Sequence, residues 1–138
     1  MARILIADDN PDILQALRLL LAELEGEVVA VTSAEAVVDH LRRQPFDLLL
    51  MDLNYSRDTT SGREGLELIA RVRQQDATLP IVVMTGWGTI DTAVEAMRRG
   101  AKSFVQKPWD DAVLLEIVQR EAAEGAALRQ RDARIARE

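Results

Sequence analysis

Apolar residues along the 138-residue chain fall into two alternating kinds of segment. Short runs rich in Ile, Val and Leu have the length and composition of buried β-strands. Longer segments carry apolar residues three and four positions apart, a spacing that predicts helices with one buried face. The five expected strands are residues 3–7, 28–31, 48–51, 81–84 and 103–105. A helical pattern follows each of them.

This alternation predicts a single α/β domain. Parallel strands need crossover connections, and right-handed crossovers place helices on both faces of the sheet. The chain has the length of one ordinary domain, and its 48% apolar content is enough for one core. We therefore expect a five-stranded parallel sheet flanked by five helices.

Residues at the predicted helix ends support these assignments. Asn10 is suited to cap a helix in which Pro11 takes the first turn, where a missing N–H costs nothing. Ser33 begins only half of a capping box. Gly26 and Gly100 follow helical patterns and suit the left-handed residue that ends a helix.

The segment 110–138 contains no proline and one glycine, so it could form one helix of up to 29 residues. Its apolar face is continuous only in the first half. Beyond Gly125 the apolar positions thin to Leu128 and Ile135, one heptad apart. The segment is either a solvated end or a linker helix that pairs with a second copy, and we favour the linker.

Composition narrows the function. The absence of cysteine excludes disulfides and thiolate metal sites and suits a reducing cytoplasm, and the single histidine, His40, cannot supply a histidine-based zinc site. The net charge of −6 argues against direct nucleic-acid binding, so any DNA contact requires another domain. No segment approaches the roughly 20 apolar residues of a membrane helix, and the N-terminal apolar run is too short for a signal peptide.

Polar side chains stand where the predicted strands end. Asp8 and Asp9 follow the first strand, Asp52 the third, Thr85 the fourth and, one residue further on, Lys107 the fifth. In a parallel sheet these positions meet at the carboxyl edge, where open α/β folds bind ligands. Three carboxylates near one amine need a cation or raised pKa values, and hard oxygen ligands favour Mg²⁺.

Each of these residues also has an ordinary structural interpretation. A single Asp at a strand end is often a turn former, and Asp8 and Asp9 could interact with a helix dipole. Thr85 could be a loop residue and Lys107 a surface lysine. Four different strands each end in a residue type suited to one reaction, and this favours a functional interpretation over the structural ones. The reaction is phosphoryl transfer to a carboxylate.

In this interpretation Asp52 is the nucleophile, and Asp8 and Asp9 hold the metal. Lys107 pairs with the new phosphoryl group, and the Thr85 hydroxyl donates to another of its oxygens.

These motifs resemble the receiver domain of two-component response regulators from about Arg3 to Val118. They are the acidic pair in 7-ADDNPD-12, Asp52 after LLLM, Thr85-Gly86 and 107-KP-108. The resemblance implies a flavodoxin-like, CheY-like fold with strand order 2-1-3-4-5.

It further implies that Asp52 is the phosphoacceptor, that Asp9 and the Asn54 carbonyl join Asp52 around Mg²⁺, and that Asp8 assists. Lys107-Pro108 is expected to be a cis peptide. Thr85 and Phe104 take the switch positions, and the Phe104 ring turns inward when the threonine moves. Such a domain is a signalling module rather than an enzyme, although it promotes its own phosphorylation and dephosphorylation.

Residues 84–110 resemble more closely the receivers of NtrC-type transcription activators. This implies a receiver domain at 1–120 and a helical linker at 121–138 toward an output domain that this chain does not contain. The expected partners are a sensor histidine kinase and a second copy of the chain, in the cytoplasm and without a membrane. DNA would be bound only through the C-terminal output domain.

The loop after Asp52 departs from the family pattern. Residues 53–65 lack the usual Met/Leu-Pro pair and are about five residues longer than expected, beyond the usual length of such connections. The loop is either a tolerated insertion or a docking lid that uses Tyr55, Arg57 or Asp58. The insertion is the favoured interpretation.

Two rival functions remain open. A phosphohydrolase of the haloacid dehalogenase kind also places its nucleophile after an apolar strand, but it commonly has a second Asp two positions later, where this chain has Asn54. A pseudo-receiver has the fold without phosphorylation, and usually lacks one of the acidic or lysine positions that are present here.

Overall fold

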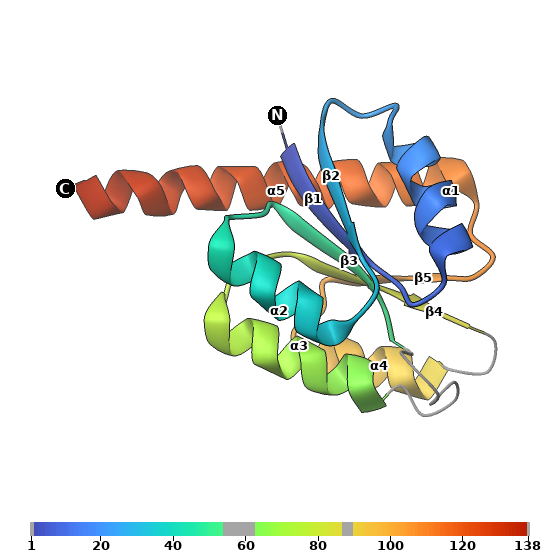
Figure 1. Cartoon of the computed structure of the whole chain (residues 1–138). Helices are drawn as coiled ribbons and strands as arrows, with labels where there is room; N and C mark the ends of the chain where they lie inside the picture. The colour runs from blue at the N-terminus through green and yellow to red at the C-terminus, as the bar shows by residue number, and fades with distance from the viewer. Residues whose placement is uncertain (1, 54–62, 87–89, 138) are drawn as a thin grey trace.

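The computed structural model describes residues 2–53, 63–86 and 90–137, in which five strands and five helices alternate (Figure 1). The strands are β1 (Ala2–Ala7), β2 (Gly26–Val31), β3 (Leu48–Asp52), β4 (Ile81–Thr85) and β5 (Ser103–Gln106). The helices are α1 (Pro11–Leu21), α2 (Ala34–Arg43), α3 (Arg63–Gln75), α4 (Ile90–Arg98) and α5 (Asp111–Arg137).

The strands form one sheet in the order β2-β1-β3-β4-β5, and every neighbouring pair is parallel. Ala7 of β1 pairs with Met51 of β3, and Asp52 pairs with Met84 of β4. The strands therefore end close together, which brings the residues that follow them to one edge. The fold class and the strand order are confirmed.

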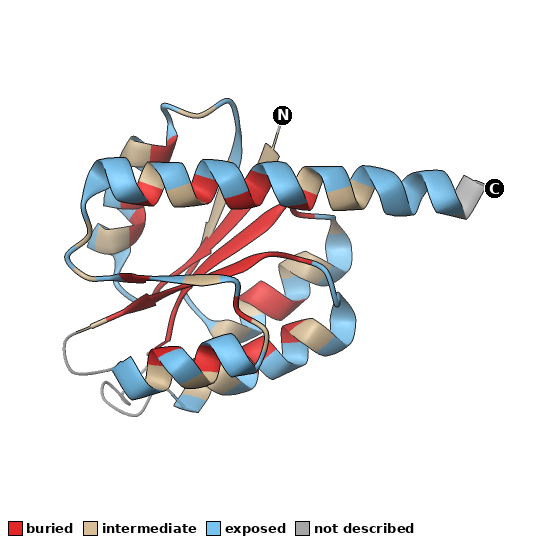
Figure 2. Cartoon of the chain, turned by 180° about the vertical axis from the view of Figure 1, so that it is seen from behind, coloured by how far each residue is buried: buried red, intermediate tan, exposed pale blue. Residues whose placement is uncertain are grey.

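Alternate strand residues face opposite sides of the sheet, as the two-residue period of a strand requires. Ile4, Ile6 and Leu50 pack in a core cluster with α1 and α5. Leu5, Leu49 and Met51 pack in a second cluster with α2, α3 and α4. The central strands β1, β3 and β4 are thus largely buried between two helical layers (Figure 2). This rigid sandwich fixes the positions of the strand ends.

Three of the four predicted helix boundaries are confirmed. The Asn10 side chain accepts the N–H of Asp12 at 2.9 Å, with Pro11 as the first residue of α1. Ser33 Oγ accepts the N–H of Ala36 at 3.2 Å before α2. Gly100, with φ +120°, follows α4 and donates to the Met97 carbonyl at 3.1 Å.

The prediction for Gly26 was wrong. The first helix ends at Leu21 with Ala22 as its C-cap, and Gly26 is the first residue of β2. Its positive φ of 152° serves the strand entry instead, because a side chain there would meet the Ala2 carbonyl of the paired strand β1.

The third and fourth strands each run one residue further than their predicted apolar runs, whereas β1 ends at Ala7 as predicted. Asp52 and Thr85 are the last residues of β3 and β4, paired with Met84 and Gln106. Their backbones are therefore held by sheet hydrogen bonds and do not belong to loops.

The final helix is continuous over 27 residues, from Asp111 to Arg137. It lies along one face of the sheet, and its last turns extend past the strands (Figure 1). The predicted single helix is confirmed over this range. No helix in the described part of the chain combines the length and the apolar character that a membrane span requires.

Candidate functional site

Three carboxylates meet at the carboxyl edge of the sheet. Asp8 and Asp9 follow β1, Asp52 ends the neighbouring β3, and one oxygen of each lies within 4.8 Å of the others. Asp8 is fully buried, Asp52 is 6% exposed and Asp9 is exposed to solvent. The sequence-based prediction that these acids converge is therefore confirmed.

Lys107 joins two of these acids from the loop after β5. Its Nζ lies 2.8 Å from Asp8 Oδ2 and 3.4 Å from Asp52 Oδ2. The other oxygen of Asp8 accepts the N–H of Asn10 at 2.9 Å. The Lys107-Pro108 peptide is cis, as expected. The ammonium is thus shared between the two buried carboxylates.

The protonation of Lys107 reflects two opposing effects. Burial is the largest single effect and lowers the pKa, because it penalises the charged amine. The hydrogen bonds and charges of Asp8 and Asp52 together outweigh burial, so the pKa of Lys107 lies above its ordinary value of 10.5. Lys107 is therefore a fixed positive charge at neutral pH.

Backbone hydrogen bonds extend the sheet ladder into the site. The Asp8 N–H donates to the Val31 carbonyl at 3.2 Å, and the Lys107 N–H donates to the Thr85 carbonyl at 2.7 Å. These bonds fix the starting points of both side chains. The site is therefore built on the rigid sheet, which favours a preorganised arrangement.

The donor set is chemically suited to a hard divalent cation. Three carboxylates face one ammonium, and the exposed Asp9 leaves the cluster open to solvent. Mg²⁺ prefers oxygen ligands and keeps several waters, which a site with an open side permits. Asn54, whose carbonyl was predicted to be a further ligand, lies outside the described residues.

The two predicted switch residues differ in burial. Thr85 is 3% exposed at the end of β4, whereas Phe104 on β5 is 45% exposed. Tyr55, Arg57 and Asp58, the predicted docking residues, lie outside the described residues.

Sequence reasoning missed how the loop after Asp52 is closed. The Gly65 N–H at the start of α3 donates to the Leu53 carbonyl at 3.0 Å. Gly65 was counted as the last residue of the polar loop 53–65, and nothing in the sequence signalled this contact.

A family model described as the response regulator receiver domain matches residues 4–119, most of the chain. The chain belongs to the response regulator receiver family. Its curated relatives include the response regulator protein FleR of Pseudomonas aeruginosa, with 37% identity over 88% of this chain. Another is the C4-dicarboxylate transport transcriptional regulatory protein DctD of the same organism, with 34% identity over 86% of this chain. NtrC-type regulators are among these relatives, as residues 84–110 indicated.

Solved structures agree with the receiver fold. The N-terminal signal receiver domain of a Bacteroides fragilis response regulator matches with a TM-score of 0.77 and 34% identity, covering 87% of this chain and 95% of that one. NtrX from Brucella abortus matches with a TM-score of 0.82 and 27% identity, covering 96% of this chain but 29% of NtrX.

The receiver domain spans 24% of the length of both FleR and DctD. It is therefore comparable to one part of those regulators. As a receiver, the chain is a signalling domain of a two-component system, and the standard function of its family is to accept a phosphoryl group.

Proposed function

We propose that Asp52 accepts the phosphoryl group. The observation that carries this proposal is the convergence of Asp8, Asp9 and Asp52 within 4.8 Å, with Lys107 bridging two of them. Asp52 stands between the other site residues, because β3 lies between β1, which leads to Asp8 and Asp9, and β4, which ends at Thr85. In the transfer, a carboxylate oxygen of Asp52 forms the new bond to phosphorus, and the bond from phosphorus to the donor histidine breaks.

Asp8, Asp9 and Asp52 would hold Mg²⁺, together with the carbonyl of Asn54. When bound, the ion neutralises charge on the phosphoryl oxygens during transfer. Asp9 is the accessible member of the set, and Asp8 is oriented by the Asn10 N–H and by Lys107. These contacts support different roles for the two neighbouring acids, with Asp9 as the more direct ligand.

Lys107 and Thr85 would bind the phosphoryl group after transfer. The ammonium already lies 3.4 Å from Asp52, so it can contact an added phosphoryl oxygen after a small movement. The Thr85 hydroxyl would donate to a second oxygen. Because the phosphoryl group adds about −1.5 to −2 charge, both contacts become stronger in the modified state.

The movement of Thr85 would let the half-exposed Phe104 ring turn inward. The surface that changes would include α4, β5 and the start of α5, which carry large exposed apolar side chains at Ile90, Val94, Met97, Phe104 and Val113. The exposed sides of α4 and α5 are both visible in Figure 2. We propose that this surface controls self-association.

A sensor histidine kinase is the proposed phosphodonor and a second copy of the chain the proposed partner, in the cytoplasm. DNA would be bound by an output domain placed after α5, as the transcriptional regulators among the relatives suggest. Residues 1–120 would then be the receiver proper and 121–138 the linker. The length of α5 supports this division of roles.

Incubation with acetyl phosphate and Mg²⁺, followed by intact mass measurement, tests the acceptor. A single phosphoryl adduct is expected on the wild type and none on Asp52→Asn. An unmodified wild type would instead favour the pseudo-receiver. Continuous turnover of a phosphomonoester would favour a phosphohydrolase.

Sedimentation of the same samples tests the coupling. Phosphorylation should shift the monomer–dimer balance of the wild type and leave that of Asp52→Asn unchanged. Phe104→Ala should keep the adduct and lose the shift. A shift in Asp52→Asn on adding phosphodonor would refute the scheme.

A further inference from the structure

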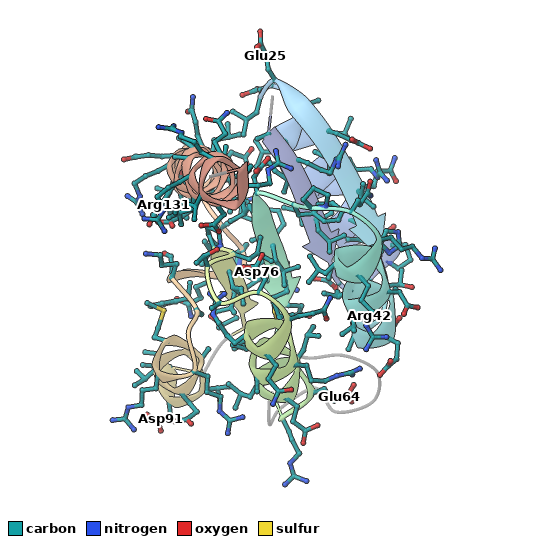
Figure 3. All side chains as sticks on the ribbon, turned by 90° about the vertical axis from the view of Figure 1, so that its left-hand side faces the viewer. Glu25, Arg42, Glu64, Asp76, Asp91 and Arg131 are labelled. Carbon is teal, nitrogen blue, oxygen red and sulfur yellow. The ribbon has the colours of Figure 1, made fainter. Side chains whose placement is uncertain are left out.

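The half of α5 beyond residue 120 lies against the domain at the edge of the sheet opposite Asp52. Ala122 is buried in the α1–α5 core cluster, and contacts continue through Gly125 to Arg129. Figure 3 looks onto this edge, with α5 seen nearly end-on and Arg131 on its outer side. The proposed linker is therefore attached to the receiver along part of its length.

Gly125 permits a close backbone approach. A β-carbon at this position would meet the carbonyl oxygen of Asp47 and lie 2.8 Å from its carbonyl carbon. It would also lie 3.1 Å from Cδ of Pro80, at the entry to β4. A glycine inside a helix is destabilising relative to alanine, so a close contact of this kind is a physical reason for its presence.

Asp47 and Arg129 form an ion pair next to this contact. Asp47 is fully buried just before β3, and its Oδ2 accepts the Arg3 N–H at 2.7 Å and Arg129 Nη2 at 3.3 Å. Its Oδ1 lies 3.1 Å from Arg129 Nε and has no other recorded partner among the described residues. A buried carboxylate is costly without a partner, so Asp47 favours the position of α5 that places Arg129 beside it.

We propose that Asp47, Gly125 and Arg129 form a docking clamp that fixes the direction in which α5 leaves the receiver. The same helix packs Leu114 and Val118 into the core. It is therefore held from its beginning to the opposite edge of the sheet. That the segment beyond the clamp carries an output domain rests on the proposed function, whereas the docking itself does not.

The direction of α5 can be measured with two spin labels, because the chain has no cysteine. Asp39→Cys on α2 and Arg134→Cys on α5 are exposed positions on separate elements. Labelled protein diluted with unlabelled protein gives the intramolecular distance distribution by pulsed electron spin resonance. A narrow single distribution is expected for the wild type.

Arg129→Ala should broaden this distribution at least about twofold and accelerate amide exchange from residue 122 onward, because local opening governs exchange. The matched control is Arg131→Ala, which removes the same charge two residues later from an exposed side chain. It should leave both measurements unchanged. Equal distributions for Arg129→Ala and Arg131→Ala would overturn the clamp.

Asp47→Asn is the second variant, because an amide oxygen can still accept the Arg3 N–H while the charge facing Arg129 is lost. It should reproduce the Arg129→Ala result. Protection of the amide protons of the central strands from exchange shows that the variant is folded. If those strands lose protection, Arg129→Ala decides alone. No phosphodonor is present, so failure of Asp52 to accept a phosphoryl group would leave this outcome untouched.

Discussion

A buried aspartate lies at each end of β3, and the two have different partners. Asp47, just before the strand, is paired with one guanidinium and one backbone N–H. Asp52, at its end, shares the Lys107 ammonium with Asp8, and Asp9 lies beside them. Burial alone therefore does not distinguish a structural carboxylate from the one proposed to accept the phosphoryl group.

The difference lies in charge balance and access. The carboxylate of Asp47 is matched by a cation of this chain and covered by α5, so it has no further chemistry to perform. The carboxyl edge has three carboxylates around one ammonium, with one acid open to solvent. Such an excess of negative charge favours the binding of a divalent cation, and the open side gives a reactant access to the carboxylates.

Replacing each of the two aspartates separately by asparagine should give the largest difference between the two ends of β3. Asp52→Asn should abolish the phosphoryl adduct, because an amide oxygen is a poor nucleophile. Asp8 is already held by the Asn10 N–H and Lys107, and Asp9 is the proposed metal ligand. Asp47→Asn should keep the adduct, since its side chain lies at the other edge. Intact mass measurement after incubation with acetyl phosphate and Mg²⁺ shows whether each variant carries the adduct.

Circular dichroism on both variants provides the folding control for this pair. An adduct retained in folded Asp52→Asn would remove the distinction between the two ends. So would an adduct lost from folded Asp47→Asn.

Stability should show the reverse contrast. Arg129→Ala should lower the free energy of unfolding by about 2 kcal/mol, because it leaves Asp47 buried without its cation. The expected loss is smaller than for a fully buried ion pair, because the Arg129 side chain is partly exposed. Arg131→Ala should change it by less than about 0.5 kcal/mol, as exposed substitutions usually do. Urea unfolding measures both values, and a similar small loss in each would show that Asp47 needs no partner.

The sequence predicted the carboxyl edge better than the amino edge, for a topological reason. A parallel sheet collects strand-end residues at one edge, so Asp8, Asp52 and Lys107 could be placed together without knowing any angle. The pairing of Asp47 with Arg129 depends on how α5 crosses the sheet, which apolar spacing does not specify. Apolar spacing also gave the wrong role for Gly26, whose positive φ serves a strand entry.

The loss of Mg²⁺ affinity expected at the carboxyl edge is smaller than the effects above. Asp9→Asn should weaken Mg²⁺ binding by about tenfold or more, equivalent to about 1.4 kcal/mol, because it removes a charged oxygen ligand. Asp12→Asn, an exposed acid in the first turn of α1, is the matched control and should bind as the wild type does. Calorimetric titration of metal-free protein gives both constants, and equal affinities would place the ion elsewhere.

The smallest expected effect is the pH dependence of the Lys107 contribution to stability, measured with a chelator present. The raised pKa means that the folded protein holds this proton more tightly than the unfolded chain does. The contribution, about 1 kcal/mol for a part-exposed pair, should therefore be complete below 10.5 and disappear as the pH rises further, through the folded-state pKa. The free energies of unfolding of wild type and Lys107→Gln should differ by a constant amount between about pH 6 and 9, well below the ordinary lysine pKa.

Lys102→Gln is the control, because Lys102 is a surface lysine paired with Glu124. A difference that declines between pH 7 and 9 would mean that burial lowers the Lys107 pKa more than Asp8 and Asp52 raise it, and the ammonium would then not be the fixed charge on which the site depends.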